Sequence, residues 1–386
     1  MSSPTDVPIR GFTPFALEEW QSRYEDHVRF NLADSGVHPA TLAELVPDDG
    51  AVAALLARDL HYPPVSGTDR LRELIAGLHP GAGAEQVLVT VGAAEANSIV
   101  AQTLVHPGDH VVVLEPGYRQ LWGSCHNLGA EVEVFHLREE HAWRPDLDEL
   151  RGRLRPDTRL VTLANPNNPA GTILSPAEMA AVVDACREVG AWLLVDEVYR
   201  GSERLTDVET PTVWGSYERL VVTGSLSKSY GLSGLRLGWL VAPADVRDAA
   251  FRRHEYVTIA TSNLSMYLAE LALAEPMRSR LLARTRAYIR EGWALMDDWL
   301  RSTDGRCGAH APDATALAFV RYDAPVDAVT VAHRIREAGV LVAPGTAFGV
   351  DRHLRITHGL RRDVLGEALD IIGSTIRDLG RDAAPR

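Results

Sequence analysis

Seven short apolar runs between residues 86 and 243 constrain the fold of this chain more than any other feature of its sequence. Continuous runs of Val and Leu are typical of strands that are covered on both faces. Several runs are separated by helix-like stretches, and one of these, residues 175–190, begins with the N-capping residue Ser175 and ends at Gly190. This alternation predicts an α/β fold built on a mainly parallel sheet of seven strands. The runs are QVLVTVG, DHVVVLEP, AEVEVFHL, TRLVTLANP, AWLLVDEVY, ERLVVTGSLSK and RLGWLVAP.

The sequence pattern changes after Leu273. A long helical pattern from about residue 276 to 300 is followed by the strand-like runs TALAFVRYD, GVLVAPG and HLRITHG and by a final amphipathic helix. A chain of 386 residues exceeds the size at which one hydrophobic core stops growing. We therefore predict a large domain over residues 47–275 and a smaller α+β domain made of residues 10–46 and 276–380. The helix-like segment PFALEEWQSRYE precedes the sheet and could join the smaller domain.

Charge and cysteine content argue against several classes of function. The net charge of -13 is the opposite of what a nucleic-acid or anionic membrane surface attracts. The three cysteines form no CxxC pair, which argues against a disulfide framework or a zinc site and fits a reducing compartment. The N-terminus lacks a basic region followed by an apolar stretch, and no apolar run reaches the length of a membrane span. We expect a cytoplasmic protein with no metal site and no nucleic-acid or membrane partner.

Lys228 lies in an unusual context, the stretch SLSKSYGLSGLRLGW. Solvent is the commonest environment for a lysine, but this one directly follows a predicted strand, where open α/β sheets bind ligands. Ser225 and Ser227 add hydroxyl groups, and Arg236 adds a planar, permanently charged group suited to phosphate. A cofactor that carries both a phosphate and an aldehyde, such as pyridoxal phosphate (PLP), would use all of these groups and form a Schiff base with the lysine.

Three further stretches are consistent with such a cofactor. In LLVDEVY, Asp196 ends a predicted strand, where its carboxylate could hold a protonated pyridine nitrogen or simply cap a helix. In LANPNNPAG, Asn168 lies in a turn and could hydrogen-bond a phenolic oxygen beside it. In TVGAAEANSIVAQTL, a helix that begins near Ala93 offers free N–H groups to an anion. Each stretch alone also has an ordinary structural explanation.

In their order along the chain, these stretches resemble the motifs of fold-type I PLP enzymes of the class I/II aminotransferase family. The resemblance extends from about Asn31 to Leu379. It implies the PLP-dependent transferase fold of type I, a PLP or pyridoxamine phosphate (PMP) cofactor, and catalytic roles for Lys228, Asp196 and Tyr199. By this resemblance, Lys228 forms the Schiff base, Ser225 and Arg236 bind the phosphate, Asp196 contacts the pyridine nitrogen, and Asn168 and Tyr199 contact the ring hydroxyl, with Asn168 also near the substrate.

Four other segments extend the resemblance. EPGYRQL implies that Tyr118 stacks on the cofactor ring, and GAAEA implies backbone donors at Ala93 and Ala94, although the hydroxyl residue often found in that loop is missing. HYPPVSGTDRLREL implies that Tyr62 reaches the phosphate bound by a neighbouring subunit, and hence a homodimer. APGTAFGVDRHLRITHG implies that Arg355 binds the α-carboxylate of the substrate. A second departure from the family pattern is Ala170, which stands where Thr is usual.

The resemblance implies transamination between an L-amino acid and a 2-oxo acid, with Lys228 as the general base. An alternative branch is cyclisation or elimination, because NLADSGVHPATLAEL is similar to the capreomycidine synthases, PLP enzymes that cyclise a hydroxylated arginine. There Ser35, Gly36 and His38, with Asp34, could bind the side chain of a cationic or guanidino amino acid in specialised metabolism such as antibiotic biosynthesis. Alternatively, Gly36 only allows a turn and His38 faces water.

A non-enzymatic alternative is a regulator built on an aminotransferase-like body. Such a protein would need a DNA-binding domain before the fold, and the family-like sequence starts by about residue 31. The motifs that nucleotide-binding proteins, zinc proteases and serine hydrolases require are also missing from the sequence.

Overall fold

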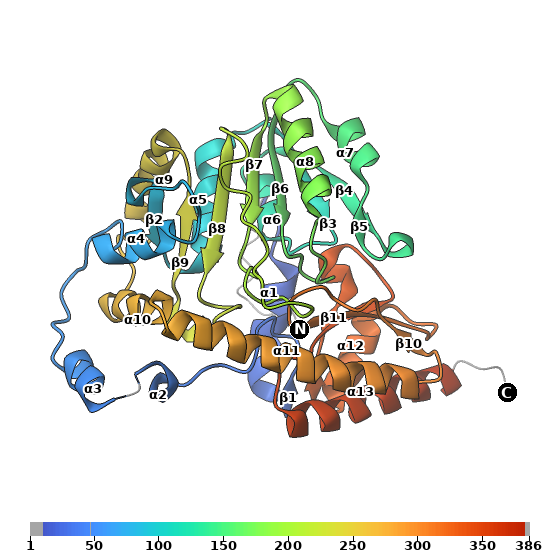
Figure 1. The fold of residues 1–386 in the computed structure, drawn as a ribbon. Coiled ribbons are helices and arrows are strands. Elements are labelled where there is room, and N and C mark those ends of the chain that lie inside the picture. The colour runs from blue at the N-terminus through green and yellow to red at the C-terminus, as the bar shows by residue number, and fades with distance from the viewer. Residues whose placement is uncertain (1–10, 47, 383–386) are drawn as a thin grey trace, which may run out of the picture.

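The computed structural model describes residues 11–46 and 48–382. All seven predicted strands form one large sheet with the order β2-β9-β8-β7-β6-β3-β4-β5, in which the two-residue β5 adds an eighth strand (Figure 1). The strands from β8 to β4 in this order run parallel, while β9 is antiparallel to both neighbours and β5 to β4. The bounds are β2 (Val87–Thr90), β3 (His110–Glu115), β4 (Glu131–Arg138), β5 (Arg144–Pro145), β6 (Thr158–Ala164), β7 (Trp192–Asp196), β8 (Leu220–Ser225) and β9 (Gly238–Val241).

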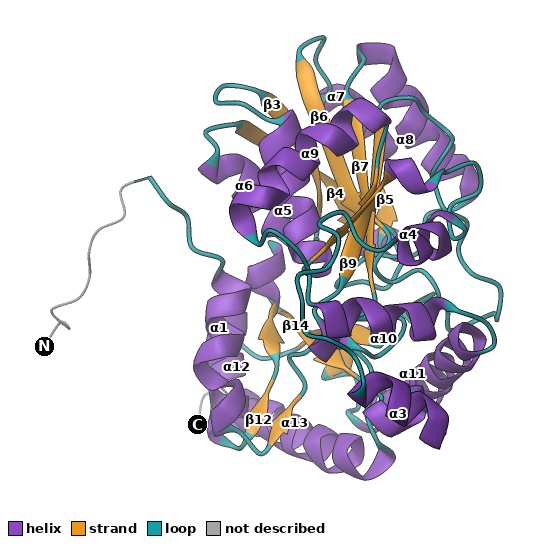
Figure 2. Cartoon of the chain, turned by 90° about the vertical axis from the view of Figure 1, so that its left-hand side faces the viewer, coloured by secondary structure: helices purple, strands orange, loops and turns teal. Residues whose placement is uncertain are grey.

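Helices cover both faces of the large sheet (Figure 2). Successive residues of one strand alternate between two apolar clusters, as Val111 and Val112 do, because side chains alternate across a sheet. The first cluster includes side chains of α5 (Gly92–Leu104), α6 (Gln120–Asn127) and α9 (Ala244–Val257). The second includes side chains of α4 (Asp69–Ala76), α7 (Leu147–Arg153), α8 (Pro176–Val189) and α10 (Asn263–Leu273). This two-sided burial explains the continuous apolar runs.

The limits of α8 follow from its own sequence. The Ser175 side chain accepts a hydrogen bond from the backbone N–H of Glu178, whose carboxylate accepts from the backbone N–H of Ser175. At the other end Gly190 adopts a left-handed conformation with φ 71°. Both predicted ends are confirmed.

A second, antiparallel sheet has the strand order β10-β11-β14-β13. Its strands and helices surround a separate apolar cluster that includes Met296, Val320, Ile335, Ile356 and Ile372. The elements are β10 (Cys307–Gly308), β11 (Leu317–Tyr322), β13 (Ala343–Pro344), β14 (His353–Thr357), α11 (Met277–Ser302), α12 (Ala328–Glu337) and α13 (Arg362–Asp382).

The N-terminal segment joins this second region. The strand β1 (Phe30–Asn31) pairs in parallel with β12 (Val340–Leu341), and α1 (Ala16–Tyr24) packs nearby through the Nε1 of Trp20, which donates to the carbonyl of Val342 at 2.8 Å. We propose that the chain divides, as predicted, into a large domain of residues 47–275 and a smaller domain of residues 10–46 and 276–380. Residues 10 and 47, at two of these boundaries, lie outside the described residues.

Two short helices, α2 (Leu42–Leu45) and α3 (Asp49–Leu56), connect the N-terminal segment to the large sheet (Figure 1). Within residues 11–46 and 48–382, no helix has the length and apolar character needed to cross a membrane.

Candidate active site

One cavity of about 360 Å³ lies where the carboxyl ends of β6, β7 and β8 meet the N-terminus of α5 and the residues of α1. This is the edge of the sheet at which open α/β folds bind ligands. Most of the site residues that were predicted from the sequence line this cavity. These are Asp34, Ser35, Ala93, Ala94, Tyr118, Asn168, Asp196, Tyr199, Ser225, Lys228, Arg236 and Arg355.

Lys228 projects into this cavity from the turn after β8. Its Nζ lies 3.5 Å from the Oδ1 of Asp34, and the lysine side chain is 22% exposed. The ammonium charge lowers the pKa of Asp34, with the backbone N–H of Ser35 acting in the same direction and burial opposing them. The hydroxyl of Tyr199 donates to the carbonyl of Ser35 at 3.2 Å, and burial raises the pKa of this tyrosine. A reachable amine and a phenol therefore face the same space.

Asp196 ends β7 and is buried at the floor of the cavity. Its two carboxylate oxygens accept hydrogen bonds from the Nδ2 of Asn97 at 2.9 Å and from the backbone N–H of Val198 at 3.0 Å. Burial raises the pKa of Asp196, while these hydrogen bonds and the charge of Lys228 oppose the rise. A buried carboxylate at this position can hold a cationic N–H group of a ligand.

Asn97 is a site residue that the sequence reasoning missed. Its Oδ1 accepts a hydrogen bond from the hydroxyl of Thr223 on β8 at 2.8 Å, so the amide is fixed between two strands and faces Asp196. The signal for it in the sequence was a polar residue among the mostly apolar buried residues of α5, such as Ala96 and Val100.

The N-terminus of α5 forms a cationic end of the cavity. Gly92 has φ 76°, and a Cβ placed on it would lie 2.7 Å from the Nη2 of Arg236, so only glycine allows the guanidinium to approach this closely. A Cβ on Gly238 would lie 2.4 Å from the backbone nitrogen of Ala93. Arg236 itself has φ 47°, a conformation that non-glycine residues adopt at a cost. Unpaired N–H groups of a first helical turn beside a guanidinium suit a phosphate group.

Arg355 lies on β14, lines the same cavity and is 1% exposed. One Nη donates to the Oδ1 of Asn168 at 3.1 Å and the other donates to the carbonyl of Ala33, while its Nε has no partner among the described residues. A buried guanidinium that faces a cavity can bind a carboxylate through two parallel hydrogen bonds.

One wall of the cavity is formed by α1 and the turn that follows it. The lining residues Glu18, Gln21, Ser22 and Glu25 have the spacing i, i+3, i+4 and i+7, which places them on one side of a helix. The hydroxyl of Tyr118 donates to the Oε1 of Glu18 at 2.7 Å. The sequence predicted this helix but not the side that faces the site, although the spacing of these polar residues was a usable signal.

Three nominated residues are not part of the cavity lining. The carbonyl of Gly36 accepts a hydrogen bond from the hydroxyl of Thr357 at 3.0 Å, and the His38 ring lies 5.6 Å from the ring of Tyr288. Neither residue therefore lines the cavity, and His38 packs against Tyr288 where the alternative had it facing water. Tyr62 is 83% exposed and lines a separate surface pocket together with Asn263.

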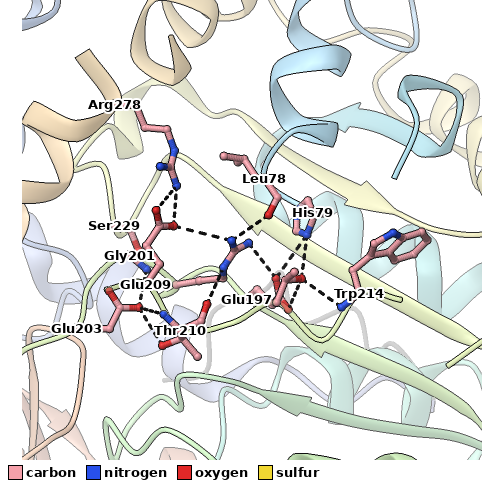
Figure 3. A network of polar contacts seen from close by, with 12 residues as sticks. Leu78, His79, Glu197, Gly201, Glu203, Glu209, Thr210, Trp214, Ser229 and Arg278 are labelled. Atoms are coloured by element: carbon pink, nitrogen blue, oxygen red, sulfur yellow. Dashed lines mark hydrogen bonds and ion pairs between the residues drawn. The ribbon is translucent and has the colours of Figure 1, made fainter. Parts of the chain in front are cut away.

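The residue after β7, Glu197, belongs to a buried network behind the site (Figure 3). Its Oε2 lies 3.5 Å from the Nη1 of Arg200 and 3.7 Å from the Nδ1 of His79. Burial and the charge of Arg200 lower the pKa of His79 to about 3, so this histidine is neutral. Arg278 of α11 donates to both oxygens of Glu209, which lies 3.9 Å from Arg200. The network connects the turn after β7 to α11.

The family model described as aminotransferase class I and II matches residues 41–372. The chain belongs to this family. This aminotransferase-family protein is 31% identical over 396 aligned residues to capreomycidine synthase of Streptomyces vinaceus, covering 100% of this chain and 99% of that protein. It is 38% identical over 205 residues to the arginine–pyruvate transaminase of Pseudomonas aeruginosa, covering 50% of this chain and 51% of that one. A solved PLP-dependent aminotransferase from Streptococcus suis superposes with a TM-score of 0.89 at 30% identity, covering 95% of this chain and 98% of that chain.

Membership in this family makes the chain a PLP-dependent enzyme of fold type I and confirms the predicted fold, family and cofactor. The regulator alternative is set aside for the same reason. The residues of the cavity fit PLP, because the cradle at Gly92 and Arg236 suits its phosphate, the buried carboxylate of Asp196 suits its ring nitrogen, and the amine of Lys228 suits its aldehyde.

Proposed function

We propose that this enzyme transfers the amino group of an L-amino acid to a 2-oxo acid. The observation that carries this proposal is the convergence of three groups on one cavity, the amine of Lys228, the buried carboxylate of Asp196 and the buried guanidinium of Arg355. Family membership supports the reaction class.

Each of these residues has a separate task in the proposal. Lys228 would hold the cofactor aldehyde, and its Nζ, when free, would take the proton from the substrate Cα as the general base. When bound, PLP supplies an electron sink for the carbanion that this proton transfer leaves. Asp196 keeps a proton on the ring nitrogen, and Arg355 binds and orients the α-carboxylate.

The remaining nominated residues position the cofactor in this proposal. Tyr118 stacks on the ring, and Tyr199 and Asn168 hydrogen-bond its hydroxyl. Ser225, Arg236 and the backbone N–H groups of Ala93 and Ala94 bind the phosphate. The placement of all seven residues around one cavity supports these assignments.

We also propose a homodimer in which Tyr62 reaches the phosphate bound by the other protomer. Tyr62 is 83% exposed, and Leu60 and Leu56 near it in sequence are 78% and 80% exposed. Exposed apolar side chains of this size in one stretch favour an interface. We further infer a cytoplasmic location, which the unpaired thiols of Cys125, Cys186 and Cys307 support.

A second candidate reaction is the cyclisation or elimination of a guanidino amino acid, as in antibiotic biosynthesis. The full-length similarity to capreomycidine synthase favours it, as does the carboxylate of Asp34 beside Lys228. Both reactions need the same base, cofactor and carboxylate site, so the residues assigned above serve either one.

Incubation of the PLP-loaded enzyme with a panel of amino acids and 2-oxo acids, followed by mass analysis, tests the two candidates. Transamination predicts a 2-oxo acid product and conversion of the cofactor to PMP. A cyclised or dehydrated product with unchanged cofactor would favour the second candidate. Absence of any product across the panel would contradict both.

A further inference from the structure

The wall that α1 contributes to the cavity is acidic. Glu18 of α1 and Glu25, which directly follows this helix, both line the cavity, with Gln21 and Ser22 between them in the sequence. Glu18 accepts a hydrogen bond from the neutral hydroxyl of Tyr118, and neither glutamate forms an ion pair with any residue in the described part of the chain. The amide of Gln21 donates to the carbonyl of Ala33 at 2.8 Å and so holds α1 against the segment that carries Asp34.

Most of the other charges that line the cavity already have counterparts. Arg236 lies beside Gly92 at the proposed phosphate site, and Asp196 is assigned to the ring nitrogen of the cofactor. The proposed function places the substrate carboxylate on Arg355. Lys228 is paired with Asp34 only until it holds the cofactor aldehyde, so Asp34, Glu18 and Glu25 are the carboxylates without an assigned cation when cofactor and α-carboxylate are in place. Of these three, Glu18 and Glu25 belong to the α1 wall.

Arg355 supplies an independent indication that a charged ligand occupies this space. It is 1% exposed, lines the cavity, and its Nε has no partner among the described residues. A buried guanidinium of this kind requires an anionic partner. A ligand that satisfies both Arg355 and the α1 wall carries a carboxylate toward Arg355 and a cation toward α1.

We propose that Glu18 and Glu25 bind the cationic group of the substrate side chain, so that the enzyme selects a basic amino acid with a guanidinium or ammonium group. This inference rests on the proposed function, because it places the α-carboxylate at Arg355. Carboxylates bind such groups through charge-assisted hydrogen bonds, which are stronger than neutral ones. The specificity then comes from the N-terminal helix and not from the motif residues around the cofactor.

Two ligands that lack an α-amine test this subsite without any chemistry on the cofactor. δ-Guanidinovalerate and heptanoate share a carboxylate and a chain of similar length, but only the first has a cationic end. Calorimetric titration of the PLP-loaded enzyme should show that δ-guanidinovalerate binds about ten-fold more tightly or better. In the double variant Glu18→Gln with Glu25→Gln, this preference should fall to about two-fold or less while the affinity for heptanoate stays unchanged.

The double variant Glu19→Gln with Asp26→Asn is the matched control. Both residues are exposed and neighbour Glu18 and Glu25 in the sequence, but neither lines the cavity, so the control changes the net charge by the same amount as the test variant. The control should keep the preference of the unmodified enzyme. A double variant that retains the preference, or an unmodified enzyme that binds both ligands equally, would overturn the inference.

The two proposals fail in different ways. An enzyme that exchanges amino groups but does not distinguish the two ligands contradicts the α1 subsite alone. An enzyme that distinguishes the ligands but yields no 2-oxo acid and no PMP contradicts transamination alone.

Discussion

The Nζ of Lys228 lies 3.5 Å from the Oδ1 of Asp34, and this contact joins the end of β8 to the segment after β1, 194 positions earlier in the chain. The carbonyls on either side of Asp34 accept hydrogen bonds from Arg355 and Tyr199. One short N-terminal segment therefore contacts three side chains from separate elements, so the geometry of the site depends on how this segment is held.

The pairing of Asp34 with Lys228 predicts a pH-dependent contribution to stability. Because the folded pKa of Asp34 is lowered, the contribution is present above the unfolded pKa and is lost as the pH falls through the folded pKa. In the protein without cofactor, Asp34→Asn should reduce the free energy of unfolding at neutral pH by about 1 kcal/mol or less, since the carboxylate is 58% exposed. Urea unfolding should show a smaller difference at the lowest pH at which both proteins fold. An undiminished difference there would contradict the pairing.

Replacement of Asp196 tests its assignment to the ring nitrogen. Asp196→Asn should still bind PLP at Lys228 but should lower kcat/KM by about 10²- to 10³-fold, because the charge that stabilises a protonated ring nitrogen is lost. Steady-state kinetics and the absorbance of the bound cofactor measure the two effects separately. Asp148→Asn, at a fully exposed carboxylate on α7, should leave both unchanged. Full activity in Asp196→Asn would contradict the assignment.

Replacement of Gly92 tests whether the cofactor phosphate binds at the N-terminus of α5 beside Arg236. Gly92→Ala combines a left-handed φ with a Cβ 2.7 Å from the Arg236 guanidinium, so PLP affinity should fall by about ten-fold or more. Equilibrium titration with PLP measures this change. Gly123→Ala on α6 meets no atom within 4 Å and should leave the affinity unaltered. Equal affinities in the two variants would show that the phosphate lies elsewhere.

Glu203 tests the buried network of Figure 3. Its carboxylate accepts from the backbone N–H groups of Gly201 and Thr210 (Figure 3). It also lies 2.7 Å from the Nη2 of Arg286, and both charged side chains are buried. Glu203→Gln should lower the free energy of unfolding by about 3 to 5 kcal/mol, because it leaves a buried guanidinium without its counter-charge. Glu275→Gln, at an exposed carboxylate 4.0 Å from Arg278, should cost about 1 kcal/mol or less. Chemical unfolding measures the loss in free energy of unfolding for each variant. Losses of similar size in the two variants would contradict this prediction.

Much of the fold could be predicted because its signals are local. A strand buried on both faces needs an apolar residue at nearly every position, and most of the seven runs meet this need, whereas β4 alternates Glu131 and Glu133 with apolar residues and is only partly buried. The capping residues Ser175 and Gly190 set the two ends of α8. Lys228, Asp196 and Asn168 were identifiable for a related reason, since each lies at or shortly after the end of a strand at the ligand edge of the sheet.

The rest of the site depends on contacts between distant parts of the chain. Glu18 and Glu25 line the cavity because α1 is held in place in part by Trp20, whose partner lies 322 positions later in the sequence. Asn97 is a site residue because the sheet brings Asp196 beside α5. For the same reason a local resemblance could not reveal that His38 lies outside the cavity lining while Asp34, four positions earlier, belongs to it.

The most direct test of the central claim is borohydride reduction of the PLP-loaded enzyme followed by peptide mass mapping. The account predicts that the peptide containing Lys228 gains the mass of the reduced cofactor and that the Lys228→Ala variant gains none. An unmodified Lys228 after reduction, or the label on another residue, would contradict it.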